Sequence, residues 1–124
     1  MHGEAFDEGP RQAAVLLGEE RTGHVVFPVT ASGREAQAFF TQGVAQLHAF
    51  LFFEAERSFR QALKIDAGCS MAYWGLAVAN RSNPKRAREF MDKAVAGKGK
   101  VSAKEGRWMD AYKDYFSEQP DETA

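Results

Sequence analysis

The feature of the sequence that most restricts its fold is a self-similar repeat of 34 residues. A shift of that length aligns bulky aromatic residues, and each is followed three positions later by a small residue. The aromatic series consists of Phe40, Trp74 and Trp108, and the small series consists of Gly43, Ala77 and Ala111. A period of roughly 20 to 50 residues is typical of proteins built from one repeated supersecondary unit. The sequence therefore predicts a stack of similar units.

A second pattern predicts that each unit is a pair of helices. A shift of 32 residues aligns Ala55 with Ala87, Phe59 with Met91 and Ala62 with Ala94. The shift is two residues shorter than 34 because the turn at 81–84 is shorter. In both segments a large residue stands between two small ones at helical spacing. Small residues allow two helices to approach closely, and the large residue fills the groove between them. We expect these segments to be the second helices of their units.

Local signals place the ends of five helices. A serine followed three residues later by a glutamate predicts a capping box, and this pattern occurs at 32–35 and 102–105. Pro84 stands where a first helical turn tolerates proline, and the glycine-containing segments 66–68 and 97–99 are typical helix stops. The predicted helices span residues 33–49, 52–65, 69–81, 84–96 and 103–116. The predicted fold class is all-α, with two complete antiparallel helix-turn-helix repeats and one capping helix.

Residues 1–31 differ in character from the helical segments, because glycine and proline interrupt them throughout. A short helix is expected only around 11–17. The apolar run 25–27 is expected to be extended, since Pro28 disfavours helical backbone in the residue before it. Val26, Phe27 and Val29 are expected to cover the first repeat. Terminal repeats need such a cover. We therefore expect three parts: an irregular N-terminal arm of residues 1–31, a repeat domain of residues 32–118 and a polar tail of residues 119–124.

Short segments spread over nearly the whole chain carry a family resemblance. They are 2–6 (HGEAF), 8–12 (EGPRQ), 27–30 (FPVT), 39–62 with its EAERSFRQ run, 70–77 (SMAYWGLA) and 83–87 (NPKRA). They resemble the tetratricopeptide-repeat family, in particular the N-terminal region of long bacterial members, common among planctomycetes, of unknown function. The resemblance implies paired helices and a protein-interaction role, and it assigns no catalytic activity. Ala67 departs from the family's usual proline, and relatives run on for many more repeats, so we expect an N-terminal fragment or a truncated paralogue.

Charge and composition argue against several classes of partner. The formal net charge is −1, whereas a dedicated nucleic-acid binder is usually clearly basic. Cys69 is the only cysteine, so no intrachain disulfide can form, and we expect a small buried packing residue. No apolar run approaches the ~20 residues that cross a bilayer. We expect neither a nucleic-acid nor a membrane partner; the chain carries no secretory signal, and the sequence leaves open whether the protein is cytoplasmic or exported.

No pattern typical of catalysis or metal binding is present. His2, His24 and His48 lack the spacing of metal ligands, although His48 is expected to face the groove or to be partly buried. The GKGK segment at 97–100 follows no predicted strand, so we interpret it as a turn rather than a phosphate-binding loop. A solvated helix face is expected to carry a group of charged residues: Glu54, Glu56, Arg57 and Arg60. We expect no enzyme activity, no cofactor and no metal.

The favoured hypothesis is a protein- or peptide-binding scaffold module whose first helices line a shallow groove. The candidate binding residues are Phe40, Val44, Leu47, His48, Trp74, Val78, Arg81 and Trp108. A second aromatic series, Phe39 and Tyr73, comes one residue earlier, and adjacent helix positions cannot face the same way. One series is therefore expected to pack between helices and the other to face the concave surface, unless all the rings belong to the core.

A second hypothesis is structural: the chain is the capping fragment of a longer solenoid and self-associates through its last helix. The second repeat can cover only one side of that helix, and exposed aromatic area marks an association surface. The expected contacts of the homodimer are Trp108, Tyr112 and Phe116.

The stretch 81–107 is locally basic, while the first twenty residues lean acidic. This basic stretch is either solvated surface or a patch for an acidic peptide or for the chain's own arm.

Overall fold

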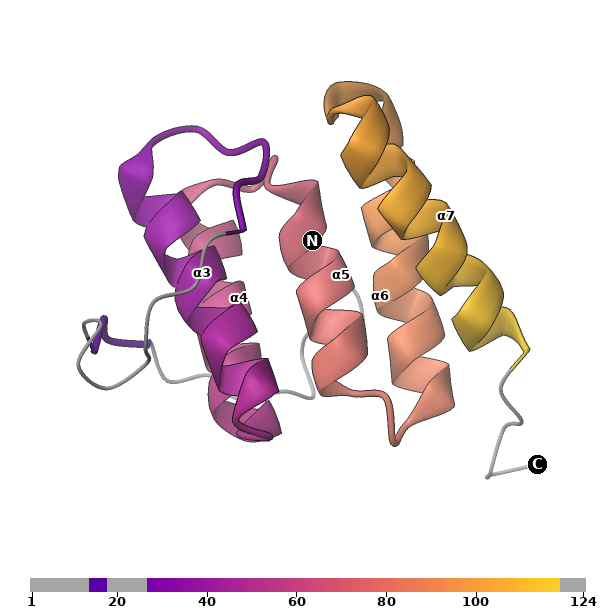
Figure 1. Ribbon diagram of the computed structural model, residues 1–124, viewed down its shortest axis with the longest axis horizontal. Coiled ribbons are helices and arrows are strands. Elements are labelled where there is room, and N and C mark those ends of the chain that lie inside the picture. The colour runs from indigo at the N-terminus through magenta and orange to yellow at the C-terminus, as the bar shows by residue number, and fades with distance from the viewer. Residues whose placement is uncertain (1–13, 18–26, 119–124) are drawn as a thin grey trace.

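The computed structural model describes residues 14–17 and 27–118, and it is all-helical over that part of the chain, without a strand. The helices are α3 (Arg34–His48), α4 (Phe52–Ile65), α5 (Ser70–Ala79), α6 (Pro84–Ala96) and α7 (Ala103–Ser117), with a short 3-10 turn η1 (Lys98–Lys100) before α7 (Figure 1). These bounds agree with the predicted helices to within two residues at each end. The predicted all-α fold class is thus confirmed.

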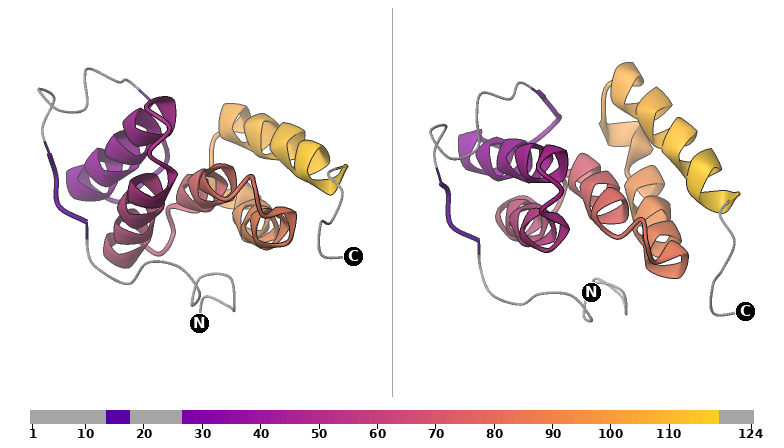
Figure 2. Two further views of the ribbon diagram at one scale, coloured as in Figure 1. Left: turned by 90° about the horizontal axis from the view of Figure 1, so that it is seen from below. Right: turned by 60° about the horizontal axis from the view of Figure 1, so that its bottom comes forward.

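The helices pack as successive antiparallel pairs around α5. Each helix packs on the next one along the chain, and α5 contacts each of the other four helices. The left view of Figure 2 shows α3 and α7 on the same side of the molecule, flanking α5. The arrangement is that of a helical repeat, in which α3, α5 and α7 are the first helices of successive units. We call the surface that these three helices share the α3–α5–α7 face.

The small–large–small pattern forms the seam between paired helices, as predicted. All six of its residues are buried: Ala55, Phe59, Ala62, Ala87, Met91 and Ala94. The ring of Phe59 lies against Gly43 of α3, where an added Cβ would come within 2.6 Å of Cε1 of the ring. The ring of Phe59 thus fills the space that Gly43 leaves on α3.

A buried ionic cluster links the two helix pairs. The Glu56 carboxylate on α4 lies 3.3 Å from Nη1 of Arg60 and 3.2 Å from Nη2 of Arg86 on α6. It also accepts a hydrogen bond of 2.8 Å from Nδ2 of Asn80, at the end of α5. Glu56 and Arg60 are 4% and 9% exposed, so the expectation that they lie on a solvated face is wrong. The reason is that Arg86 of α6 and Asn80 at the end of α5 reach Glu56 from the next helix pair, which no local pattern in α4 signals.

One of the two predicted capping boxes is present. The Ser102 side chain accepts a hydrogen bond from the Glu105 N–H, and the Glu105 carboxylate accepts one from the Ser102 N–H. At the start of α3 the expected box is wrong, because Gly33 is the N-cap, with φ +100°, and no side chain caps the helix. The Ser32 N–H instead donates to Oδ2 of Asp66, at 2.6 Å.

Two segments of the N-terminal arm are described. Residues 27–31 run without helical structure into α3, with the Phe27 ring against the helices, as expected for the cover. Residues 14–17 are not helical, contrary to expectation, because their backbone bonds to a side chain of α3 instead. The Gln42 amide accepts a hydrogen bond from the Leu17 N–H and donates one to the Val15 carbonyl. Residues 11–13 of the expected helix and residues 25 and 26 of the expected extended run lie outside the described part of the chain.

Candidate functional site

The 34-residue aromatic series comes together around a single ring of the arm. Phe27 stacks on Trp74 of α5, with ring centroids 5.5 Å apart and planes 30° apart. It meets Phe40 of α3 and Trp108 of α7 edge-on, at 5.3 and 5.8 Å. Trp74 is therefore the floor, and Phe40 and Trp108 are the two walls, of a site that we call the aromatic box. Edge-to-face and offset pairs of this kind are the favoured arrangements of aromatic rings.

A side-chain amide binds the backbone on either side of Pro28. Oε1 of Gln37 accepts a hydrogen bond of 2.9 Å from the Val29 N–H, and its Nε2 donates one of 2.9 Å to the Phe27 carbonyl. Nε2 also donates to the Thr41 hydroxyl at 3.0 Å, which holds the amide in this orientation. Gln37 thus pairs with the extended segment as a neighbouring strand would, through one donor and one acceptor.

Glu105 binds the next residue of the arm. Its Oε1 accepts a hydrogen bond of 2.8 Å from the Thr30 N–H, and its Oε2 accepts one of 2.7 Å from the Thr30 hydroxyl. Burial raises the pKa of this carboxyl group, but the hydrogen bonds from Thr30 and Ser102 outweigh that effect and leave its pKa below the ordinary value. The group is therefore a carboxylate at neutral pH, able to accept from both residues at once.

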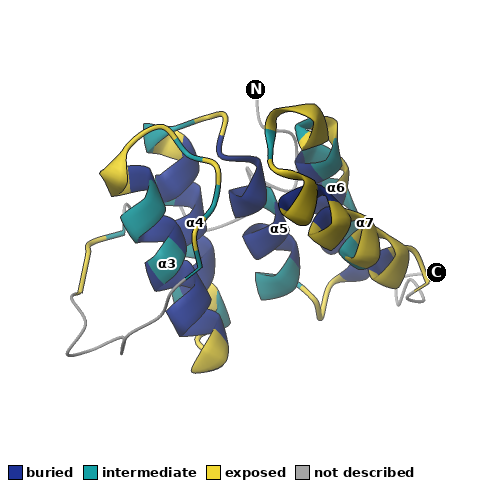
Figure 3. Cartoon of the chain, turned by 45° about the horizontal axis from the view of Figure 1, so that its top comes forward, coloured by how far each residue is buried: buried dark blue, intermediate teal, exposed yellow. Residues whose placement is uncertain are grey.

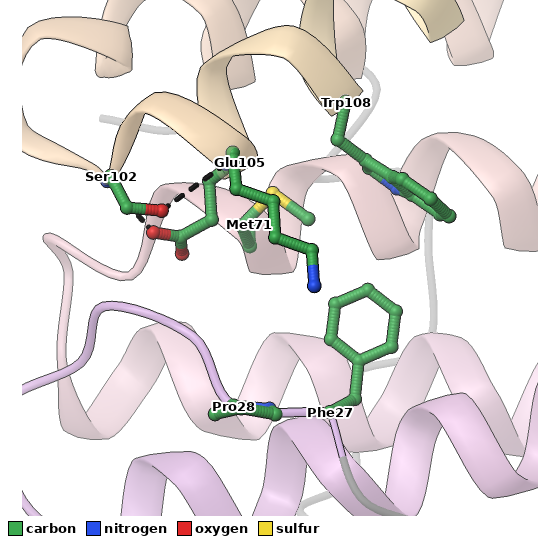
Figure 4. A pocket seen from close by; sticks show the side chains of 7 residues that line it. Phe27, Pro28, Met71, Ser102, Glu105 and Trp108 are labelled. Atoms are coloured by element: carbon green, nitrogen blue, oxygen red, sulfur yellow. Dashed lines mark hydrogen bonds between the residues drawn. The ribbon is translucent and has the colours of Figure 1, made fainter.

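The space beside the arm is hollow. A cavity of about 360 Å³ lies between the arm and the start of α7, lined by Phe27, Pro28, Met71, Ser102, Lys104, Glu105 and Trp108. In Figure 4 the rings of Phe27 and Trp108 lie close together at one side of this space, and Ser102 and Glu105 lie at the other. The arm thus leaves part of the α3–α5–α7 face uncovered at this end.

A second hollow continues the α3–α5–α7 face toward the ends of α5 and α7. Its volume is about 410 Å³, and its lining residues are Val78, Arg81, Ala111, Tyr112, Tyr115 and Phe116. The Arg81 guanidinium lies over the Phe52 ring of α4, 4.7 Å from its centroid, within the range of a cation–π interaction. This end of the face therefore carries a positive charge beside aromatic rings.

The predicted binding residues divide by burial. Phe40, Val44, Leu47 and Trp74 belong to the buried core, with exposed fractions of 0%, 2%, 9% and 4%. Val78 is half-buried, whereas Trp108, Arg81 and His48 are exposed. The face therefore brings together Phe40, Trp74 and Trp108 at one end and Val78 and Arg81 at the other. His48 was expected to face the groove or to be partly buried, and it is exposed because α3 ends there and no helix covers it.

The expected division of the two aromatic series between helix packing and concave surface is not seen, and Phe39, Phe40 and Trp74 all belong to the core, which is closer to the alternative. Phe39 and Phe40 are both buried, with exposed fractions of 6% and 0%, and Tyr73 is half-buried while Trp74 is buried. Phe40 and Trp74 belong to the core and at the same time contact Phe27. The binding role of these residues remains a prediction, because a partner could reach them only where the arm now lies.

Three contributors to the site were not found from the sequence. Gln37 and Thr30 carry no recognisable signal, since a glutamine on a helix and a threonine before it are typical of solvated surface. Glu105 was identified only as a capping residue, and its contact with the arm depends on a hydrogen-bonding partner 75 positions away in the chain. A pattern within one helix cannot reveal such a contact.

One buried polar atom of the box has no partner among the described residues. Nε1 of Trp74 is a hydrogen-bond donor, it is buried, and no acceptor lies within reach of it. Buried indole N–H groups usually find an acceptor, and leaving one unpaired costs about 1–3 kcal/mol. The arm therefore covers the Trp74 ring without supplying a hydrogen-bond acceptor for its N–H.

Other kinds of site find no support in the described residues. They contain no group of three or more histidine, cysteine, aspartate or glutamate residues able to hold a metal ion. Burial raises the pKa of the Cys69 thiol to about 11, which fits the expected packing role. In the part of the chain that the structure covers, no helix has the length and apolar character needed to cross a membrane.

The fold and the geometry define an all-helical chain in which one face, built from alternate helices, holds an extended segment. Comparison with models of protein families, with curated proteins and with solved structures finds no match to this chain.

Proposed function

We propose that this chain is an interaction module of the tetratricopeptide-repeat type, without catalytic activity, that binds an extended segment of a partner protein on its α3–α5–α7 face. The observation that carries the proposal is that this face already holds the segment 27–30 of the chain itself. The contacts are of three kinds: a ring in the aromatic box, a backbone pairing with Gln37 and a hydrogen-bonded side chain at Glu105.

The contacts have the character of peptide recognition. Main-chain hydrogen bonds supply affinity for any extended segment, and pockets for alternate side chains supply specificity. Gln37 provides the first kind of contact, and the aromatic box and Glu105 provide the second. Stacked helix pairs create such extended surfaces because equivalent helices line up along one side. The 34-residue period and the family resemblance support the assignment to this type of repeat.

The test uses peptide selection on the full-length protein. A random peptide library displayed on phage is selected against the Phe27→Ala chain, in which the ring of the arm no longer fills the box, and the enriched peptides are measured against three further variants of that chain. Trp108→Ala removes a wall of the box, Gln37→Ala removes the backbone contact, and Phe53→Ala removes an exposed ring on α4 as a matched control. We expect affinity to fall at least tenfold in the first two variants and to be unchanged in the third. Enriched peptides that bind all three variants equally would contradict the proposal.

The alternative is a capping piece of a longer solenoid that self-associates through α7. Figure 3 shows that much of α7 is exposed, and Ala111 and Tyr115 are among its exposed residues. The surface is smaller than expected from the sequence, however, since Phe116 is 1% exposed and Trp108 packs against Phe27. Sedimentation of the wild type against Tyr115→Glu tests this alternative, because a dimer through α7 would dissociate in the variant.

A further inference from the structure

The first position of the bound segment requires an aromatic side chain. Phe27 contacts rings from three helices, and its stacked and edge-on pairs are available only to another aromatic ring. An aliphatic residue would fill less of the space above Trp74 and would lose these geometries. The box is therefore selective by shape and by ring electrostatics.

The second position suits proline. The Gln37 amide reaches from the carbonyl of Phe27 to the N–H of Val29, so the nitrogen between them needs no hydrogen bond. Proline lacks an N–H, fixes its own φ and biases the preceding residue toward extended backbone. A proline here therefore orders the segment in its bound conformation before binding.

The fourth position requires a hydroxyl group. The two carboxylate oxygens of Glu105 each accept one hydrogen bond from Thr30. Oε1 accepts from the Thr30 N–H, and Oε2 accepts from the Thr30 hydroxyl. Glu105 is 6% exposed, so a residue without the hydroxyl would leave a buried carboxylate oxygen with only the Ser102 N–H. Serine and threonine both supply the donor, whereas valine, of the same shape as threonine, does not.

We propose that the α3–α5–α7 face selects partner segments with the pattern aromatic–proline–any residue–serine or threonine, and that residues 27–30 (FPVT) are an internal occupant which such a segment replaces. This inference rests on the proposed function and names the chemistry of its partner. The occupant can be replaced because Pro28 and Thr30 are exposed and because it leaves the Trp74 N–H unpaired.

An internal segment competes at a high effective concentration, so the experiment first weakens it. The full-length Phe27→Ala variant removes the ring that fills the box. The probe is a fluorescent peptide that copies residues 25–32, and fluorescence anisotropy measures its binding. We expect saturable binding to the variant, at least tenfold tighter than to the wild type, where the arm competes.

Matched peptides test each position of the pattern. Alanine in place of the phenylalanine should abolish binding, alanine in place of the proline should weaken it severalfold, and valine in place of the threonine should weaken it about tenfold. The valine effect should shrink on a chain that also carries Glu105→Gln, since glutamine keeps the capping box but presents a single acceptor oxygen. A folded Phe27→Ala chain that binds no peptide, or binds all four equally, would overturn the proposal.

A second releasing variant covers the case in which Phe27→Ala does not fold. Thr30→Asp keeps the apolar ring and places a carboxylate against Glu105, and Thr30 is exposed. The same peptide should bind this variant more tightly than the wild type. If sedimentation instead shows a wild-type dimer that Phe27→Ala abolishes, the occupant is the arm of a second copy, and the proposal of a separate partner is overturned.

The peptide selection separates this inference from the proposed function. Enriched peptides that depend on Trp108 and Gln37 but lack the aromatic–proline–any–serine/threonine pattern would leave the interaction module standing and overturn the pattern. An absence of enriched peptides, together with no binding of the FPVT probe to either released variant, would overturn both.

Discussion

Gly75 of α5 lies directly against the ring of Phe59 on α4, so closely that a Cβ atom at Gly75 would come within 2.5 Å of the ring. The same ring lies against Gly43 of α3. Phe59 is therefore wedged between α3 and α5 at the two places where those helices have no side chain. This contact sets the spacing of the two helices that carry Phe40 and Trp74, and so it sets the width of the aromatic box.

Gly75→Ala should destabilise the protein by about 1–3 kcal/mol, because the added methyl group overpacks a rigid ring. The measurement is the midpoint of urea unfolding followed by circular dichroism. Gly99→Ala is the control, since nothing lies within 4 Å of its Cβ position, and its midpoint should not move. An unchanged midpoint for Gly75→Ala would show that the helices separate at no cost.

Phe27→Ala should lower the free energy of unfolding by about 2 kcal/mol, since Phe27 is a half-buried ring whose loss opens a cavity above Trp74. The tryptophan emission should shift to longer wavelength as Trp74 and Trp108 gain contact with water. Phe53→Ala, an exposed ring on α4, should change neither quantity. Emission that stays at the wild-type wavelength would mean that the arm does not cover the box in solution.

Glu56→Ala should cost about 3 kcal/mol, because removal of one partner from a buried ionic cluster leaves buried guanidinium groups without that carboxylate. Arg60 and Arg86 are the groups affected. The control is Glu54→Ala on the same helix, whose pair with Arg57 is partly exposed and is worth about 0–1 kcal/mol. Equal losses in thermal or urea unfolding would contradict the distinction between the two pairs.

The stability of the protein should depend on pH through Glu105. Its pKa in the folded chain lies below the ordinary value of 4.5, so folding favours the carboxylate. The contribution is complete above the ordinary pKa and is lost as the pH falls through the lower pKa of the folded chain. Urea midpoints measured between about pH 3 and 6 should therefore fall more steeply with acid for the wild type than for Glu105→Gln. Parallel curves would show that Thr30 and Ser102 do not stabilise the carboxylate.

The helices and their pairing follow from patterns that are local in the sequence. The seam formed by Ala55, Phe59 and Ala62 repeats at helical spacing, and Pro84 begins α6 because it needs no N–H there. Such signals depend on the periodicity of one helix and on the chemistry of its ends. The all-α fold and the bounds of its helices could therefore be predicted from the residues alone.

The candidate site depends on contacts between distant parts of the chain, which no local pattern encodes. Ser32 and Ser102 begin the same serine-to-glutamate motif, yet only Ser102 caps its helix. At the other site Gly33 adopts a positive φ, and the Asp66 carboxylate at the end of α4 accepts a hydrogen bond from the Ser32 N–H. Likewise, Glu105 binds Thr30 only because the arm passes between α3 and α7. Helix periodicity depends on residues that are neighbours in the sequence. The hydrogen-bonding partner of a polar group depends instead on which atoms the packed helices bring within about 3 Å of it.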